Sequence, residues 1–138
     1  MKQTKLQIIL FAMALMAIAS CVRDEPIGFQ DAMKWKTDVP MKNRGVEVSA
    51  EGGTYKFECT NYEEVWLSYV RANGEYIYTE NEEYYTIIGE WFDVHAERSV
   101  LEGVISPNND SYIRELKVSV REGNAFYTFW FDQDGINE

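Results

Sequence analysis

From Gly45 onward, apolar and polar residues alternate along the chain with a period of two. In residues 54–60, for example, the apolar side chains of Tyr55, Phe57 and Cys59 are separated by polar neighbours. Because successive side chains of a β-strand point to opposite faces, this pattern predicts a strand that is buried on one face.

The same alternation predicts further strands, which are separated by turn residues. Residues 114–121 form the clearest case, with Leu116, Val118 and Val120 as the buried set. Gly, Pro, Asn and Asp indicate turns at 51–53, 73–74, 107–110 and 123–124. The other predicted strands lie at 46–48, 65–70, 75–79, 84–88, 91–96, 100–105 and 125–132.

Seven or more short strands with frequent turns predict an all-β chain that folds as an antiparallel β-sandwich. A β-barrel of similar size is the alternative architecture. No stretch beyond residue 20 has a convincing helical period.

Residues 1–20 have the pattern of a lipoprotein signal peptide. Lys2 and Lys5 precede an apolar run at 6–17, and Ile18-Ala19-Ser20 forms a small-residue box before Cys21. The run is too short for a spanning helix. We therefore expect Cys21 to be lipidated and to anchor the protein to a membrane. The alternative is an ordinary secretory peptide, which has no reason to place Cys after the cut.

Residues 21–44 are predicted to form a tether, and residues 45–138 the folded domain. The tether has scattered charges, Pro40 and little periodicity. Phe29 and Trp35 are exceptions that could dock on the domain. Asp24 and Glu25 resemble part of the acidic export signal of some surface lipoproteins. The expected location is the cell envelope, at the outer membrane, with surface exposure left open.

Composition restricts the partners. The chain has 13 Lys and Arg against 23 Asp and Glu, a formal net charge of −10. This charge argues against nucleic acid and anionic lipid surfaces, which require clustered cations. If Cys21 is acylated, Cys59 is the only other cysteine, and the mature domain has no internal disulfide.

Several short motifs follow one another over roughly residues 45–134. They are Glu51-Gly52-Gly53-Thr54-Tyr55, Trp66, Ile105-Ser106-Pro107-Asn108, Arg114-Glu115-Leu116-Lys117-Val118, Gly123-Asn124 and the closing segment from Phe129 to Gln133. In kind and order they resemble the BACON-type Ig-like domain of envelope lipoproteins. The resemblance implies a seven-stranded Ig-like sandwich, and a role in carbohydrate binding or as a spacer beside carbohydrate-active enzymes. Residues 75–91 are longer and more aromatic than in the family.

No catalytic, metal or cofactor site is predicted. The single histidine, His95, lies in a strand pattern without a companion ligand or nucleophile. Carboxylate pairs such as Glu82-Glu83 could hydrolyse glycosides in principle. In so acidic a chain, however, such pairs arise from composition alone.

Aromatic residues are the candidate binding groups, because the chain has nine Tyr, seven Phe and four Trp. If Tyr127, Phe129 and Phe131 are buried, alternation leaves Phe126 and Trp130 on the opposite face. Either this face binds a ligand, or the tether covers it. A second aromatic group flanks the turn at 79–83 and is either a binding surface or a hairpin with cross-strand aromatic pairs. The predicted ligand-binding residues are Tyr76, Tyr78, Tyr84, Tyr85, Trp91 and Trp130.

The sequence therefore predicts a lipid-anchored, non-catalytic envelope domain that binds carbohydrate or acts as a spacer. The alternative is an assembly component of an envelope complex that uses the aromatic patch as a protein interface.

Overall fold

The computed structural model describes residues 30–78 and 85–137, and within them the chain is all-β. No helix in this part has the length and hydrophobicity to cross a membrane. The predicted signal peptide and Cys21 lie outside the described residues. The strands are β1 (Trp35–Lys36), β2 (Gly45–Val48), β3 (Gly53–Cys59), β4 (Trp66–Ala72), β5 (Glu75–Ile77), β6 (Thr86–Ile88), β7 (Phe92–Glu97), β8 (Val100–Ile105), β9 (Arg114–Glu122) and β10 (Ala125–Gln133).

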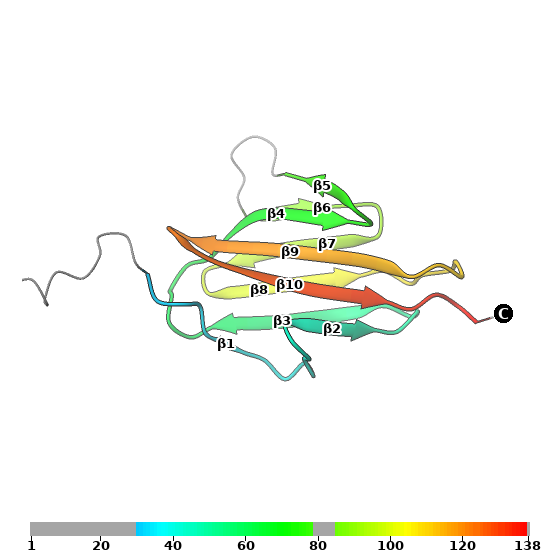
Figure 1. The fold of residues 1–138 in the computed structure, drawn as a ribbon, viewed down its shortest axis with the longest axis horizontal. Coiled ribbons are helices and arrows are strands. Elements are labelled where there is room, and N and C mark those ends of the chain that lie inside the picture. The colour runs from blue at the N-terminus through cyan, green and yellow to red at the C-terminus, as the bar shows by residue number, and fades with distance from the viewer. Residues whose placement is uncertain (1–29, 79–84, 138) are drawn as a thin grey trace, which may run out of the picture. The chain divides into compact units, whose positions relative to one another are not determined.

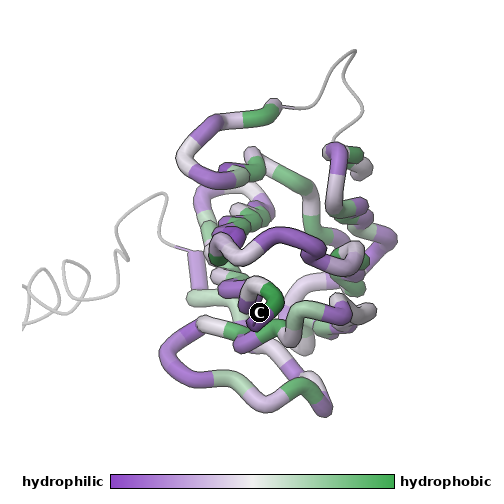
Figure 2. The backbone as a smooth tube through the Cα atoms, turned by 90° about the vertical axis from the view of Figure 1, so that its right-hand side faces the viewer, coloured by the Kyte–Doolittle hydropathy of each residue, from purple (hydrophilic) through white to green (hydrophobic). Residues whose placement is uncertain are grey.

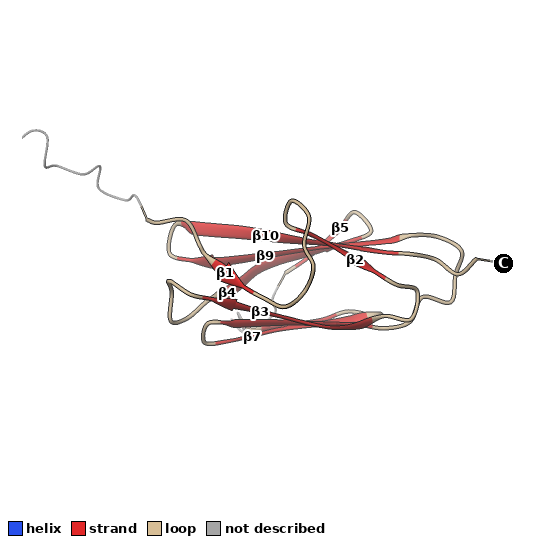
Figure 3. Cartoon of the chain, turned by 90° about the horizontal axis from the view of Figure 1, so that it is seen from below, coloured by secondary structure: helices blue, strands red, loops and turns tan. Residues whose placement is uncertain are grey.

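The strands form two five-stranded sheets that lie in two layers (Figures 1 and 3). Sheet A has the order β1-β3-β8-β7-β6, and sheet B has the order β2-β10-β9-β4-β5. Neighbouring strands are antiparallel except β2, which runs parallel to β10. The arrangement is a β-sandwich.

The core lies between the sheets and consists of the inward-facing residues of the alternating strands. Phe57 of β3 packs on Phe129 and Phe131 of β10, with ring centroids 4.3 and 6.0 Å apart. Leu116, Val118 and Val120 of β9 are buried, as their spacing predicts. Figure 2 shows the resulting interleaving of hydrophobic and hydrophilic positions along the backbone.

The expected strands are present, but their number and direction differ in part. The described residues hold ten strands, whereas the expected sandwich had about seven: β2 to β10 lie at the nine predicted positions, and β1 is a two-residue strand that the alternation does not predict. The sandwich is also not entirely antiparallel. The chain crosses from sheet B to sheet A between β2 and β3, so β2 does not form a hairpin and instead pairs with β10 in the same direction.

Residues 31–44, assigned to the tether by the sequence pattern, pack against the sandwich. The compact unit begins at Asp31. Met33 is buried, with 6% of its surface exposed, and Trp35 pairs through β1 with Cys59. The Asn61 side chain accepts a hydrogen bond from the Lys34 N–H and donates one to the carbonyl of Ala32. These non-local contacts explain why a segment without periodicity is part of the domain.

The crossing between the sheets depends on close backbone contacts. Gly52 has φ +79°, and a Cβ at this position would lie 2.2 Å from the carbonyl oxygen of Ile105. The buried amide of Gln133 donates to the carbonyls of Ser49 and Ser106, at 3.2 and 2.9 Å. Gln133 therefore joins the end of β10 to the loops that follow β2 and β8.

We predict that Gly52→Ala is more destabilising than Gly74→Ala. Both glycines have positive φ, but nothing lies within 4 Å of a Cβ at Gly74. Gly74→Ala should cost about 1 kcal/mol from backbone strain alone. Gly52→Ala should cost roughly 2–4 kcal/mol, because the backbone must also move. Urea unfolding of the two variants checks this, and equal losses would contradict the close contact.

We also predict that Met33→Ala lowers the free energy of unfolding by about 2 kcal/mol or more, since a buried methionine is truncated. Lys36→Ala is the matched control, because Lys36 is exposed on the same segment; it should change stability by less than about 0.5 kcal/mol. Thermal or chemical unfolding measures both. If Met33→Ala matches the control, this segment does not contribute to the core.

Candidate functional site

The outward-facing residues of β10 form the centre of the candidate site. Alternation turns Phe129 and Phe131 into the core and leaves Phe126, Thr128 and Trp130 on the outer face. Phe126 and Trp130 are 57% and 47% exposed. The predicted division of β10 into two aromatic faces is confirmed.

The tether does not cover Trp130 through Trp35. Trp35 instead packs on the inward-facing Tyr127 and Phe129, with centroids 5.8 and 4.9 Å away. Phe29, the other aromatic residue considered for this role, lies outside the described residues. Trp130 therefore stays exposed next to the strands that flank it.

Strand register places two cations between two aromatic rings on this face. Trp130 is opposite Lys117 of β9, Lys117 is opposite Arg71 of β4, and Arg71 is opposite Tyr76 of β5. The Lys117 ammonium lies 4.7 Å from the centroid of the Trp130 ring, and the Arg71 guanidinium lies 5.1 Å from that of Tyr76. Both distances fall within the range of cation–π contacts.

These residues line a shallow depression, here called the sheet B groove, with a volume of about 320 Å³. Tyr76, Tyr69 and Trp130 supply its aromatic surface. The ring of Tyr69 meets that of Tyr76 edge-on at 5.3 Å, and Tyr78 stacks on Tyr76 at 6.1 Å. The lining residues are Asn43, Arg44, Tyr69, Arg71, Tyr76, Lys117, Thr128 and Trp130.

A tight turn brings Asn43 and Arg44 to the groove. Both have positive φ, 51° and 66°, and Lys42 and Gly45 exchange two backbone hydrogen bonds across them at 2.9 Å. The carbonyl of Arg44 accepts a hydrogen bond from the Trp130 N–H at 2.9 Å. The Arg44 guanidinium lies over Tyr127, 4.6 Å from the centroid.

Only some of the predicted ligand-binding residues lie together in the structure. Tyr76 and Trp130, from two different predicted patches, line the same groove, and Tyr78 extends it. Trp91 lines a different hollow of about 660 Å³ together with Ile77 and Ile88. Tyr84 lies outside the described residues.

Tyr85 lies just before β6 and is bound to a different partner. Its hydroxyl donates a hydrogen bond to Glu64 Oε1 at 2.6 Å. This bond lowers the pKa of the Glu64 carboxyl and raises the pKa of Tyr85, because it stabilises the carboxylate and the neutral phenol. Tyr85 therefore links β6 to the segment before β4 and does not line the sheet B groove.

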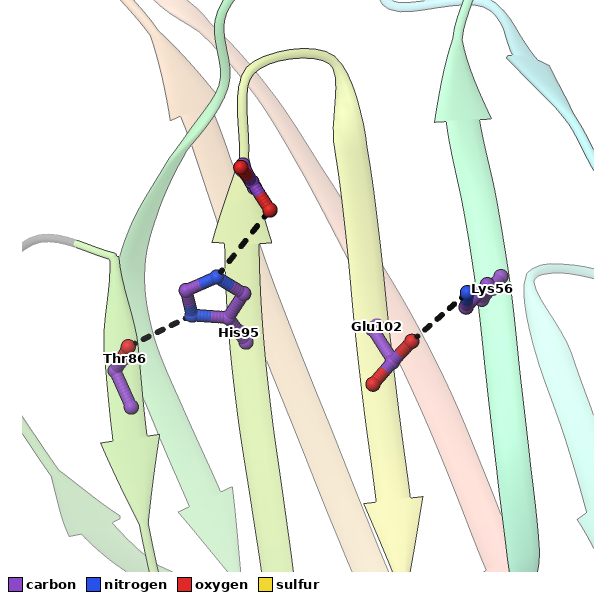
Figure 4. A network of polar contacts seen from close by, with 5 residues as sticks. Lys56, Thr86, His95 and Glu102 are labelled. Carbon is purple, nitrogen blue, oxygen red and sulfur yellow. Dashed lines mark hydrogen bonds and ion pairs between the residues drawn. The ribbon is translucent and has the colours of Figure 1, made fainter.

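The outer face of sheet A carries a polar row in place of aromatic rings (Figure 4). Thr86 and His95 Nδ1 share a hydrogen bond at 2.8 Å, and Lys56 forms an ion pair with Glu102 at 3.3 Å. His95 Nε2 is 4.0 Å from Glu97, too far for a hydrogen bond. The row therefore has the geometry of cross-strand pairs on a solvated face rather than that of an oriented general base.

No group of three or more His, Cys, Asp or Glu side chains in the described part of the chain could hold a metal ion. Cys59 is buried, and its thiol donates to Asn61 Oδ1 at 3.4 Å.

A protein from Bacteroides thetaiotaomicron, whose structure was determined by NMR, is similar to this chain. The TM-score is 0.71 and the sequence identity is 38%, and the alignment covers 86% of this chain and 99% of that protein. The chain belongs to the same family as this Bacteroides protein. No family model matches the chain. No curated protein matches it either.

Six residues of the sheet B groove were not predicted from the sequence of this chain: Asn43, Arg44, Tyr69, Arg71, Lys117 and Thr128. A signal existed for two of them, because the turns at 73–74 and 123–124 determine the hairpin register. That register places Arg71 opposite Tyr76 and Lys117 opposite Trp130. The pairing of β4 with β9, which joins the two hairpins, has no comparable local signal.

An acidic row borders the cations. Asp132 of β10 is opposite Glu115 of β9 and Glu47 of β2. Desolvation raises the pKa of Asp132, and the charges of Glu115 and Glu47 raise it further, while Lys117 lowers it. The folded state therefore binds a proton at Asp132 more tightly than the unfolded chain does.

We predict that Asp132→Asn stabilises the protein at neutral pH by on the order of 0.5 kcal/mol, because like charges face each other across strands. The raised pKa means that ionisation of Asp132 lowers stability as pH rises through its folded value. The gain should therefore shrink as pH falls toward the ordinary Asp pKa. Urea unfolding over this pH range measures it. Asp93→Asn is the control, since Asp93 faces Ile88 and Val104; an equal gain there would refute the like-charge explanation.

Proposed function

We propose that this chain is a lipid-anchored, non-catalytic domain of the bacterial cell envelope, and that its sheet B groove binds carbohydrate. One observation carries the proposal: Trp130 and Tyr76, which are 54 positions apart in the sequence, are both about half exposed and line the same groove.

The groove has the components that a sugar requires. A sugar ring presents a C–H face that packs on flat aromatic rings, and hydroxyls that need hydrogen-bond partners at the rim. Trp130, Tyr69 and Tyr76 provide the aromatic area, while Asn43 and Thr128 provide polar groups. A few polar groups around an apolar surface are typical of small-ligand sites.

The composition of the groove also favours binding over hydrolysis. Its lining contains no Asp, Glu or His. Glycoside hydrolysis normally uses two carboxyl groups placed on either side of the scissile bond. Asn43, Thr128 and the two cations are therefore the groups that would orient a bound sugar.

The strand order supports an Ig-like type of sandwich. In Ig domains, strands A, B, E and D form one sheet, and strands C, F and G form the other. The orders β1-β3-β8-β7 and β10-β9-β4 have this arrangement, with β2 added beside the last strand. This order and the motifs at 51–55 and 129–133 support a domain of the BACON type.

The anchoring proposal rests on the N-terminal sequence. A charged start, an apolar run and the small-residue box before Cys21 support lipidation at that cysteine. The relative from Bacteroides thetaiotaomicron supports a bacterial source and does not bear on the location in the cell. Since the compact unit begins at Asp31, residues 22–30 remain as the spacer between the anchor and the domain.

Affinity electrophoresis tests the proposal. A chain of residues 22–138, which includes the whole compact unit, is run through gels that contain host or dietary polysaccharides. We predict retardation in at least one gel. Trp130→Ala and Tyr76→Ala should each weaken binding about tenfold, the factor that corresponds to a stacking contact of about 1.4 kcal/mol.

Phe126→Ala is the matched control. Phe126 is exposed on the same strand and face as Trp130 but does not line the groove, so this variant should bind like the parent chain. Absence of retardation in every gel would overturn the carbohydrate proposal. Capture of an envelope protein that depends equally on Phe126 and Trp130 would replace it with a protein interface.

A further inference from the structure

We propose that the glycan recognised by the sheet B groove is acidic, and that Arg71 and Lys117 bind a carboxylate of one of its sugar units. This inference rests on the proposed carbohydrate-binding function and specifies its ligand class. It follows from the order of side chains across four adjacent strands, β10, β9, β4 and β5 (Figure 1).

The row runs from an aromatic ring through two cations to a second aromatic ring. Trp130, Lys117, Arg71 and Tyr76 are successive cross-strand partners. Because neighbouring strands lie about 4.8 Å apart, the row spans roughly 14 Å. This length suits a short oligosaccharide rather than one sugar ring. Outer units would pack on Trp130 and Tyr76, and the unit between them would face the two cations.

The local charge in the groove is opposite to that of the whole chain. The chain has a net charge of −10, yet the lining includes Arg44, Arg71 and Lys117 and no acidic residue. Lys117 is partly neutralised by Glu115, 3.4 Å away. None of the ion pairs found among the described residues involves Arg71. Its Nε donates to the carbonyl of Gly74 at 3.3 Å.

The placement of these two cations is unfavourable for the fold when no anion is bound. Arg71 and Lys117 are directly opposite each other, and like charges in this position destabilise a sheet. An anion bound between them would remove the repulsion. The cation–π contacts place the two cations over the rings of Tyr76 and Trp130, so a bound glycan would meet rings and cations together.

A carboxylate fits these cations better than a neutral hydroxyl or a dense array of sulfates. The planar guanidinium of Arg71 matches the two oxygens of a carboxylate, and charge-assisted bonds of this kind are strong. The net charge of −10 repels a polymer with closely spaced charges at long range. A glycan whose carboxylates are separated by uncharged sugar units meets both conditions.

Paired polymers that differ only in charge test the inference. Polygalacturonate, alginate and hyaluronan are each compared with the same polymer after methyl esterification of its carboxylates, using residues 22–138. We expect at least one acidic polymer to bind about tenfold more tightly than its ester. Arg71→Gln and Lys117→Gln should each remove most of this preference, whereas Arg71→Lys should retain part of it.

Lys56→Gln is the control for net charge, because Lys56 lies on the outer face of sheet A and not in the groove. It should leave the preference unchanged, and unfolding curves establish that each variant is folded. Equal binding of the acidic polymers and their esters would overturn this inference and leave the carbohydrate function intact. Binding of sulfated polymers alone would overturn the carboxylate assignment. No binding to any acidic or neutral polymer would overturn the carbohydrate function itself.

Discussion

The packing of β10 on the opposite sheet determines what the outer surface presents. Phe129 and Phe131 are held against Phe57 in the core, and this contact fixes the rotation of β10 about its own axis. Because side chains alternate, Thr128 and Trp130 must then face outward. A shift of one residue would bury Trp130 and expose two phenylalanines. The core therefore determines the position of the groove.

The local distribution of charge on the surface differs from the net charge of the chain. A net charge of −10 describes how the molecule is seen from a distance, whereas a ligand in contact meets the local side chains. On the outer face of sheet B, a row with Lys117 and Arg71 lies next to a row with Glu115 and Asp132. Amino-acid composition does not reveal these two rows of opposite charge, because they form only when strands distant in sequence are placed side by side.

Features that form through contacts between neighbouring residues can be predicted from the sequence, whereas features that need contacts between distant segments cannot. Period-two alternation is local, and so the strands and the inward set of β9 are predictable. The turn at Asn73 and Gly74 is also local, since both residues have the positive φ that a two-residue hairpin turn needs.

The rest depends on contacts between distant segments. The docking of Met33 and Trp35 relies on partners such as Asn61 and Phe129, and the groove relies on the pairing of β4 with β9. The positive φ of Arg44 was also unpredictable, because arginine has no preference for that conformation. For these reasons, the sequence indicated Tyr76 and Trp130 singly but gave no indication that they lie in one site.

The short edge strands of the two sheets limit aggregation between neighbouring molecules. Within the described residues, the edge strands β1, β2, β5 and β6 are only two to four residues long. A long, unpaired edge is a template for pairing with another molecule and hence for aggregation. Proteins anchored in the same membrane, as proposed for this one, collide repeatedly in two dimensions. Edges this short offer few backbone groups to a neighbouring copy, so close packing of such domains on a membrane would carry little risk of strand exchange.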